Sequence, residues 1–231
     1  MLMLLIYMFL KRTRNPKRAA MVQQVRKYII ARVPFFFITL LVLLLLLIPI
    51  LVKTQSLLLY YKIVQGGDEI GWLRLEKNIA GSQSRLLLVS EINTRFIIRI
   101  RVSATESSTF ENGKLVHSAQ FRKTNGETKV DKQTRLVSGN YEVMENGGTE
   151  KLSIRFIGTN LLSLYFQEPV GINQVYCDKH AGFITVTKTG DGGYRVKFPD
   201  GNSNIFYYSR GICTRIRISH TFYTAEIIKT T

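Results

Sequence analysis

Apolar and polar residues alternate along most of the chain after residue 57. Ile98, Ile100 and Val102, for example, alternate with Arg99 and Arg101, which is the pattern of a strand with one dry and one wet face. Asn-Gly, Asp-Gly and Gly-Gly turns separate such runs, and these pairs supply the positive φ that tight hairpins require. We therefore predict an antiparallel sheet with strands at 57–64, 69–78, 84–93, 96–109, 114–123, 127–136, 140–145, 150–157, 182–188, 193–198, 203–208 and 212–219.

One segment departs from this alternation. Thr159 or Asn160 can cap a helix, and Pro169 prevents that helix from continuing. Between them, three residues have helical spacing and share one face: Leu161, Leu164 and Tyr165. A long twisted sheet curls, and its apolar face must be covered because large exposed apolar patches are rare on monomers. The predicted fold is mainly β: a curved antiparallel meander, either a half-barrel or an open barrel, with this one short helix in its concavity.

The longest apolar run, Val33–Val52, contains twenty residues without a charge. As a helix it would be about 30 Å long, which matches the hydrocarbon core of a bilayer. Nine of the 32 Lys and Arg residues lie in 1–56, eight of them before Val33, and no acidic residue precedes Asp68. This positive-inside pattern predicts a basic cytoplasmic segment at 1–32, a transmembrane or signal-anchor helix at 33–52 and an exported antiparallel β-domain at 57–231.

A cleaved signal peptide is the alternative for the same run. Small residues allow a cut near Ser56, which would release the β-domain as a secreted protein. A run of twenty residues exceeds the roughly 7–15 of a cleaved signal, so its length favours a membrane anchor with the C-terminal domain in the periplasm or outside the cell. The net charge of +16 then reflects topology and not nucleic-acid binding, because export removes the domain from DNA.

The wet face of the predicted sheet is strongly basic. Its basic residues recur on successive strands: Arg99, Arg101, Arg122, Lys123, Lys129, Lys132 and Arg135. The simpler interpretation is a solvated face on which Lys and Arg discourage aggregation between sheet edges. The functional alternative is contact with an anionic component of the cell envelope.

Three short motifs resemble those of one family. They are Tyr61-x-Ile63-x-x-Gly66-x-x-x-Ile70-Gly71, Leu164-Tyr165-Phe166-x-Glu168-Pro169 and Phe198-Pro199-Asp200-Gly201-x-x-x-x-Phe206-x-Tyr208. From about Leu57 to Ile228 the chain resembles an uncharacterised domain-of-unknown-function family of exported bacterial β-proteins, similar in style to lipoprotein-carrier half-barrels. The resemblance implies a strongly curved sheet with a helix in its mouth. It implies no activity, so it assigns no catalytic residue.

Three classes of function remain open. The concave face can bind an apolar or lipid-like ligand beside the short helix, and the candidate ligand-binding residues are Leu161, Leu164, Tyr165 and Trp72, of which Trp72 also fits the core. Alternatively, the domain is a structural or protein-interaction module of the envelope with a filled core. The third class is an enzyme of unknown type. The sequence contains none of the nucleophile-elbow, P-loop, zinc-protease or dinucleotide motifs, so we expect no enzyme activity and no cofactor.

The two cysteines carry the remaining chemistry. In an oxidising compartment Cys177 and Cys213 can form a disulfide, which would typically add about 2–4 kcal/mol of stability, or they can stay free. Cys177 and His180 have C-x-x-H spacing, but a structural zinc site needs four ligands, so we expect no metal there. A Cys177 nucleophile with His180 as its base is the weakest alternative, because sequence neighbours rarely have the required geometry.

Overall fold

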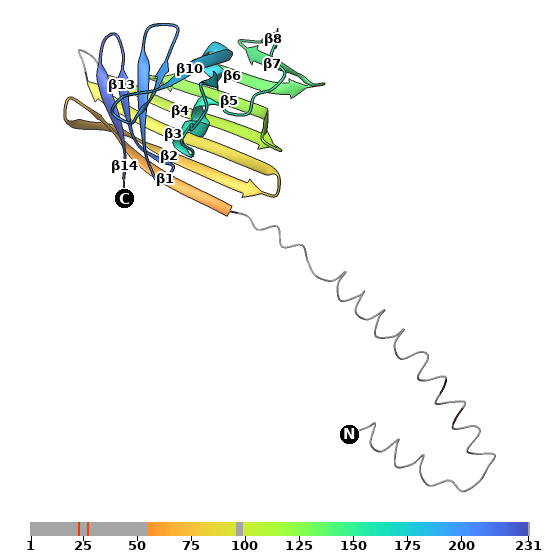
Figure 1. The fold of residues 1–231 in the computed structure, drawn as a ribbon. Coiled ribbons are helices and arrows are strands. Elements are labelled where there is room, and N and C mark those ends of the chain that lie inside the picture. Colours follow the sequence, from red (N-terminus) through yellow and green to blue (C-terminus); the bar gives the residue numbers. More distant parts are fainter. Residues whose placement is uncertain (1–22, 24–26, 28–54, 96–98, 231) are drawn as a thin grey trace. The chain divides into compact units, whose positions relative to one another are not determined.

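The computed structural model describes residues 55–95 and 99–230, together with residues 23 and 27. Within these residues, fourteen strands form one antiparallel sheet (Figure 1). In chain order they are β1 (Gln55–Gln65), β2 (Asp68–Ala80), β3 (Gln83–Arg95), β4 (Arg99–Glu111), β5 (Lys114–Thr124), β6 (Glu127–Val137), β7 (Asn140–Glu145), β8 (Gly148–Leu152), β9 (Gln174–Cys177), β10 (Gly182–Lys188), β11 (Tyr194–Lys197), β12 (Ser203–Ser209), β13 (Ile212–Ser219) and β14 (Thr224–Lys229). Two short 3-10 helices accompany them, η1 (Leu161–Tyr165) and η2 (Asp178–His180).

β1 lies in the interior of the sheet, although it is the first of the described strands in chain order. The chain runs outward from β1 through β8 to one edge, crosses to the opposite edge at β9, and returns through β13 to β14. β14 then pairs with β1, with Tyr61 opposite Lys229 and Ile63 opposite Ile227. The predicted single meander is therefore corrected to two antiparallel meanders joined by one long-range strand pair.

Local pattern predicts the hairpins well. All twelve predicted strands overlap an observed strand, and 140–145, 182–188 and 212–219 have the predicted bounds. The alternation does not predict β9, which has only four residues with three successive buried positions, or β14, which follows Phe222 and Tyr223 without a glycine turn. The predicted strand 150–157 ends at Leu152, where the chain leaves the sheet to cross to the other edge.

The predicted cytoplasmic segment 1–32 and transmembrane helix Val33–Val52 lie outside the described residues. Among the residues that are described, no helix combines the length and the apolar character that a membrane span requires. β1 begins at Gln55, so the described sheet starts two residues before the predicted domain boundary at Leu57.

The crossing segment, residues 153–173, passes over the inner face of the sheet (Figure 1). Its backbone is tied to both meanders. The Leu115 N–H donates to the Ile157 carbonyl at 2.8 Å, and the Tyr176 N–H donates to the Thr159 carbonyl at 3.0 Å. Within this segment η1 contacts β3 and β4 of the first meander and β9 and β13 of the second. The segment therefore lies across the concavity and connects the two meanders.

A capping box starts η1. The Asn160 side chain accepts a hydrogen bond from the Ser163 N–H at 3.1 Å, and the Ser163 hydroxyl accepts one from the Asn160 N–H at 3.4 Å. The prediction that Thr159 or Asn160 caps this segment is therefore confirmed, with Asn160 as the cap. The element is a 3-10 turn, however, and its three residues per turn change which side chains face the sheet.

The apolar residues of this segment are divided between the core and its rim. Leu164 is buried, as predicted, and Leu162 and Phe166 are buried beside it. Leu161 and Tyr165, which the helical spacing placed on the same face as Leu164, are half-buried and pack against the core from its edge.

The β9 end of the sheet curls over the inner face of β5 and β6. The hydroxyl groups of Tyr176 on β9 and Thr134 on β6 are hydrogen-bonded at 3.1 Å. Asp178 in η2 accepts a hydrogen bond from the Ser118 hydroxyl on β5. Buried apolar residues from both meanders, among them Leu75 and Val196, form one continuous core in the space that this curl encloses.

Replacing Leu164 by alanine tests the packing of η1. Because the side chain is 1% exposed, Leu164→Ala should lower the free energy of unfolding by about 2–5 kcal/mol through lost burial and a new cavity. Val170→Ala, at a position that is 72% exposed, should change it by less than about 0.5 kcal/mol. Chemical denaturation measures both variants. Equal, small effects for the two would show that η1 does not cover the sheet.

Candidate functional site

An apolar cavity of about 410 Å³ lies in the concave side of the sheet. β1–β4, β13 and β14 form its walls together with the loop before β14, and η1 contributes one residue. Its lining residues are Ile63, Gln65, Ile70, Leu73, Leu88, Ser90, Ile92, Thr94, Ile100, Val102, Glu106, Tyr165, Ile218, Tyr223, Ala225 and Ile227. Pockets that bind small molecules typically measure roughly 300–1,000 Å³, so the cavity has the size of a ligand site.

The composition of this wall is unusual for so basic a chain. Ten of the sixteen lining residues are aliphatic and two are tyrosines. None of the sixteen is Lys, Arg or His, although the chain contains 32 Lys and Arg residues. The wall therefore suits an apolar ligand, and it offers few groups that could fix a polar one.

Glu106 is the one ionisable carboxyl group in the wall. It lies on β4 opposite Leu88 of β3 and Gln120 of β5, on the same side of the strand as Val102. The pKa of Glu106 is raised from 4.5 to about 7: burial and the nearby carboxyl of Asp178 raise it, whereas a hydrogen bond from Gln120 and the charge of Arg122 lower it. At neutral pH this side chain can therefore gain or lose a proton when its surroundings change.

Tyr165 places a second polar group at the cavity. Its ring meets Tyr61 and Phe206 edge to face, each at a centroid distance of 5.9 Å, and these contacts fix its orientation. Burial raises the pKa of the Tyr165 phenol well above its usual value, and the nearby Glu106 adds to the effect. The phenol therefore stays protonated and can donate a hydrogen bond toward the cavity.

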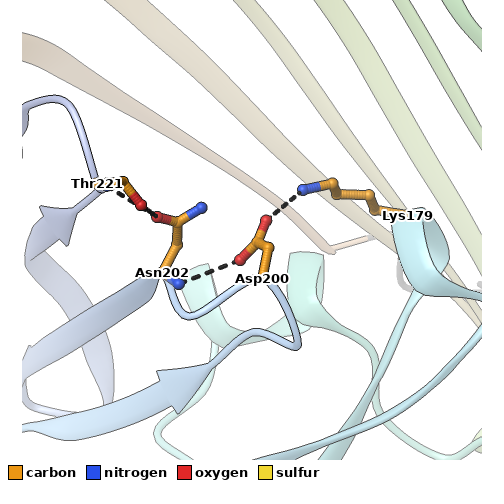
Figure 2. Close-up of polar contacts among 4 residues, drawn as sticks. All are labelled: Lys179, Asp200, Asn202 and Thr221. Atoms are coloured by element: carbon orange, nitrogen blue, oxygen red, sulfur yellow. Dashed lines mark hydrogen bonds and ion pairs between the residues drawn. The ribbon is translucent and has the colours of Figure 1, made fainter.

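The hairpin between β13 and β14 forms one rim of the cavity. Tyr223 of this hairpin lines the cavity and stacks on His220 with ring centroids 4.7 Å apart. Figure 2 shows how the hairpin is held: the Thr221 N–H donates to the Asn202 side-chain oxygen at 3.0 Å. The same chain of contacts continues from the Asn202 N–H to Asp200 at 3.1 Å and from Asp200 to the Lys179 ammonium at 3.0 Å.

A buried polar cluster lies beside the cavity under η2. Asp178 accepts hydrogen bonds from Ser118, from Thr134 at 3.4 Å and from Asn160 at 3.4 Å. Burial raises the pKa of Asp178, and these three hydrogen bonds oppose the rise. Because each of these buried groups has a partner, we assign the cluster to the fold: it holds the second meander on the first.

Lys132 corrects the predicted basic face. Its side chain is buried on the inner side of β6, where the ammonium pairs with Glu145 at 3.0 Å and donates to the Lys179 carbonyl at 3.2 Å. Strand parity also places Arg122 on the inner side, near Glu106. The basic residues that the sequence assigned to one wet face are therefore divided between the two faces of the sheet.

Of the four predicted ligand-binding residues, the structure places only Tyr165 in the cavity wall. Leu164 belongs to the buried core, and Leu161 packs at its edge. Trp72 is 43% exposed and lies on the outer face of β2, because its neighbours Leu73 and Leu75 occupy the inner face. Its predicted place in the core or in the concave wall is therefore corrected.

Of the two alternatives for the cysteines, a disulfide or free thiols, the structure has the free thiols. Cys177 on β9 and Cys213 on β13 are both buried free thiols, and three strands of the sheet separate β9 from β13. Burial raises the pKa of each thiol, that of Cys213 to about 12, which opposes formation of a reactive thiolate. In the described part of the chain, no three His, Cys, Asp or Glu side chains gather closely enough to hold a metal ion.

Sequence reasoning missed Glu106, although a signal for it was present. The alternation that places Ile100 and Val102 on one face of β4 continues through Ala104 to Glu106 and ends at the buried Phe110. Following that parity would have placed a carboxyl group on the inner face. Its neighbours Ser107 and Ser108 give this part of the strand a solvent-exposed appearance.

The geometry defines a curved antiparallel β-protein with an apolar cavity and a single carboxyl group in the cavity wall. The chain belongs to the family described as Domain of unknown function (DUF6134), whose family model matches residues 61–230. This confirms the resemblance to a domain-of-unknown-function family.

The chain has no match among curated proteins. Among solved structures it is similar to a crystal structure of a beta-barrel-like protein of Domain of Unknown Function DUF1849 from Brucella abortus. The two sequences are 12% identical, the TM-score is 0.48, and the alignment covers 75% of this chain and 95% of that chain.

The raised pKa of Glu106 predicts how stability depends on pH. Because the folded-state pKa is about 7 against 4.5 for the ordinary group, the folded chain keeps this proton while the unfolded chain loses it. The free energy of unfolding is therefore highest, with respect to this group, below about pH 4. It falls as the pH rises to about 7. Glu106→Gln stays neutral, so it should be about 3 kcal/mol more stable than the wild type at pH 8 and equal to it at pH 4.

Denaturation at the two pH values measures this difference. Glu111→Gln, at an exposed position on the same strand, is the matched control and should follow the wild type. Identical pH profiles for Glu106→Gln and Glu111→Gln would show that Glu106 titrates as an ordinary carboxyl group.

Proposed function

We propose that this protein is a membrane-anchored or exported binding module that holds an apolar or lipid-like ligand in its concave cavity, without chemical turnover. The observation that carries the proposal is the cavity of about 410 Å³ with twelve aliphatic or tyrosine residues in its wall. When an apolar ligand displaces water from such a wall, apolar surface is removed from water, and this makes binding favourable. The two polar groups, Glu106 and Tyr165, are suited to orient one end of the ligand.

The cavity volume sets the size of the ligand. A protein cavity of about 150 Å³ accommodates a benzene ring, which has six carbon atoms. By the same scale a cavity of about 410 Å³ accommodates roughly 12–16 carbon atoms. The ligand that fits best is therefore one medium-length chain or a compact ring system, and not a lipid with two long chains.

The location of the protein belongs to the same proposal. The twenty uncharged residues Val33–Val52 have the length of a membrane span, and eight basic residues precede them. We place the N-terminus in the cytoplasm and the β-domain on the other side of the membrane, where apolar molecules leave or enter the bilayer. If the leader is cleaved near Ser56, the same domain is secreted.

A second candidate function is a protein-interaction or structural module of the cell envelope. The observation that favours it is a set of exposed apolar side chains on the outer face of β1 and β2: Leu58 is 48% exposed, Tyr60 49% and Trp72 43%. Tyr60 pairs with Arg74 and Trp72 with Lys62, so the two rings lie on adjacent strands of one face. A retained ligand separates the two functions, because only the binding module requires one.

Native mass spectrometry of the full-length protein, released from mild detergent, tests ligand binding. We expect additional lipid-like mass on the wild type. Val102→Trp should abolish it, because Val102 lines the cavity and the larger ring fills it. Thr105→Trp places the same ring at an exposed position of the same strand and should retain the extra mass. Equal retention by both variants, or no extra mass on any of them, would contradict the proposal.

A reporter fused after Thr231 tests the topology. The positive-inside pattern predicts that alkaline phosphatase is active at this position and that green fluorescent protein, fused to the same position, is dark. The phosphatase folds only in an oxidising compartment, and the fluorescent protein serves as the cytoplasmic counterpart. An inactive phosphatase together with a bright fluorescent protein would place the β-domain in the cytoplasm and contradict the proposed export.

A further inference from the structure

The carboxyl group of Glu106 lines the cavity, and none of the other lining residues carries a positive charge. The ion pairs formed among the described residues do not include Glu106. Arg122, whose charge lowers the pKa of Glu106, is exposed and does not line the cavity. A carboxyl group in an apolar wall must be neutralised by a proton or by a cation. The lining residues supply no cation, so Glu106 can pair with a cation that arrives with a ligand.

Two further features of the wall favour a cation. Tyr165 and Tyr223 both line the cavity, and a tyrosine ring attracts a cation within about 6 Å of its face. Asp178 does not line the cavity, but its carboxyl group raises the pKa of Glu106, so a second acidic group lies near this part of the wall. None of the sixteen lining residues is Lys, Arg or His, so no group within the wall itself opposes the charge of Glu106.

We propose that the cavity binds a single-chain amphiphile with an ammonium head group, which pairs with Glu106 while its chain lies against the aliphatic wall. This inference rests on the proposed function and specifies its ligand class. The ammonium takes the place of the proton on Glu106, so the carboxylate and the head group neutralise each other inside the wall. The neighbouring Tyr165 hydroxyl and ring supply a hydrogen-bond partner and a cation–π surface.

Other head groups fit the same wall less well. A carboxylate head would bring a second anion beside Glu106 and Asp178, and like charges in contact raise each other's pKa and oppose binding. A hydroxyl head can hydrogen-bond to Glu106, but it leaves the charge of that group unbalanced above neutral pH. For chains of equal length, we therefore expect the affinity to be highest with an ammonium head group, lower with a hydroxyl and lowest with a carboxylate.

Photoaffinity labelling of the full-length protein in lipid nanodiscs tests this order. Three probes share one 12-carbon chain, a length that follows from the roughly 12–16 carbon atoms the cavity accommodates, and one diazirine group. They end in an ammonium, a hydroxyl or a carboxylate. Peptide mapping then measures labelling of β4 and β13, which contribute Val102 and Ile218 to the wall, separately from labelling of the apolar N-terminal run.

For the wild type we expect the ammonium probe to label these strands about tenfold more than the carboxylate probe, the factor of a close charge pair. Glu106→Gln should reduce this preference to less than about threefold while the hydroxyl probe still labels the cavity, because the variant removes the charge and keeps the volume. Glu111→Gln, on the exposed end of β4, should keep the wild-type preference.

The possible failures are distinguishable. If the three probes label the cavity equally, or if Glu106→Gln leaves the preference unchanged, the ammonium head group is refuted and apolar binding stands. If no probe labels β4 or β13, or if Val102→Trp labels as strongly as the wild type, the cavity is not the binding site and the proposed function fails together with this inference.

Discussion

Antiparallel pairing of β1 with β14 is the contact on which the remainder of the structure depends. It joins the two meanders into one sheet, and the Tyr61 hydroxyl reinforces it by donating to the Cys213 carbonyl on β13 at 2.7 Å. The register of this pair places Ile63 directly opposite Ile227, and both residues line the cavity. The same hydrogen bonds that complete the sheet therefore bring the two halves of the cavity wall together, so the fold and the binding site cannot be separated.

Sequence alone predicted the hairpins because each depends on a few neighbouring residues, such as the turn Asn112-Gly113 and the alternation on either side of it. The long-range pair β1–β14 left no local signal. The face of Trp72 was predictable, since Leu73 and Leu75 define the inner parity of β2, but the large apolar ring suggested a core position instead. Lys132 shows the opposite error: its charge suggested solvent, whereas Glu145 and a backbone carbonyl make its burial tolerable.

The candidate site was predicted only in outline. An apolar concavity with Tyr165 at its edge follows from a curled sheet and a short helix. Glu106 did not follow, because a carboxyl group is ordinarily solvent-exposed and its burial depends on elements distant in sequence. Some motif residues that carry the family resemblance serve the fold and not the candidate site. At Gly71 a Cβ atom would lie 2.2 Å from the Glu91 carbonyl oxygen, so only glycine fits there.

The position of β1 inside the sheet also determines when folding can finish. Synthesis delivers β1 first and β14 last, and the contact between Tyr60 and Thr230 joins residues 170 positions apart. Until β14 appears, one edge of β1 has no hydrogen-bonding partner, and an unpaired strand edge can pair with another chain. Pairing across such a separation is also slow, because the loop must close before its contacts are gained. The nascent chain therefore passes through a period of aggregation risk that ends only when β14 pairs with β1.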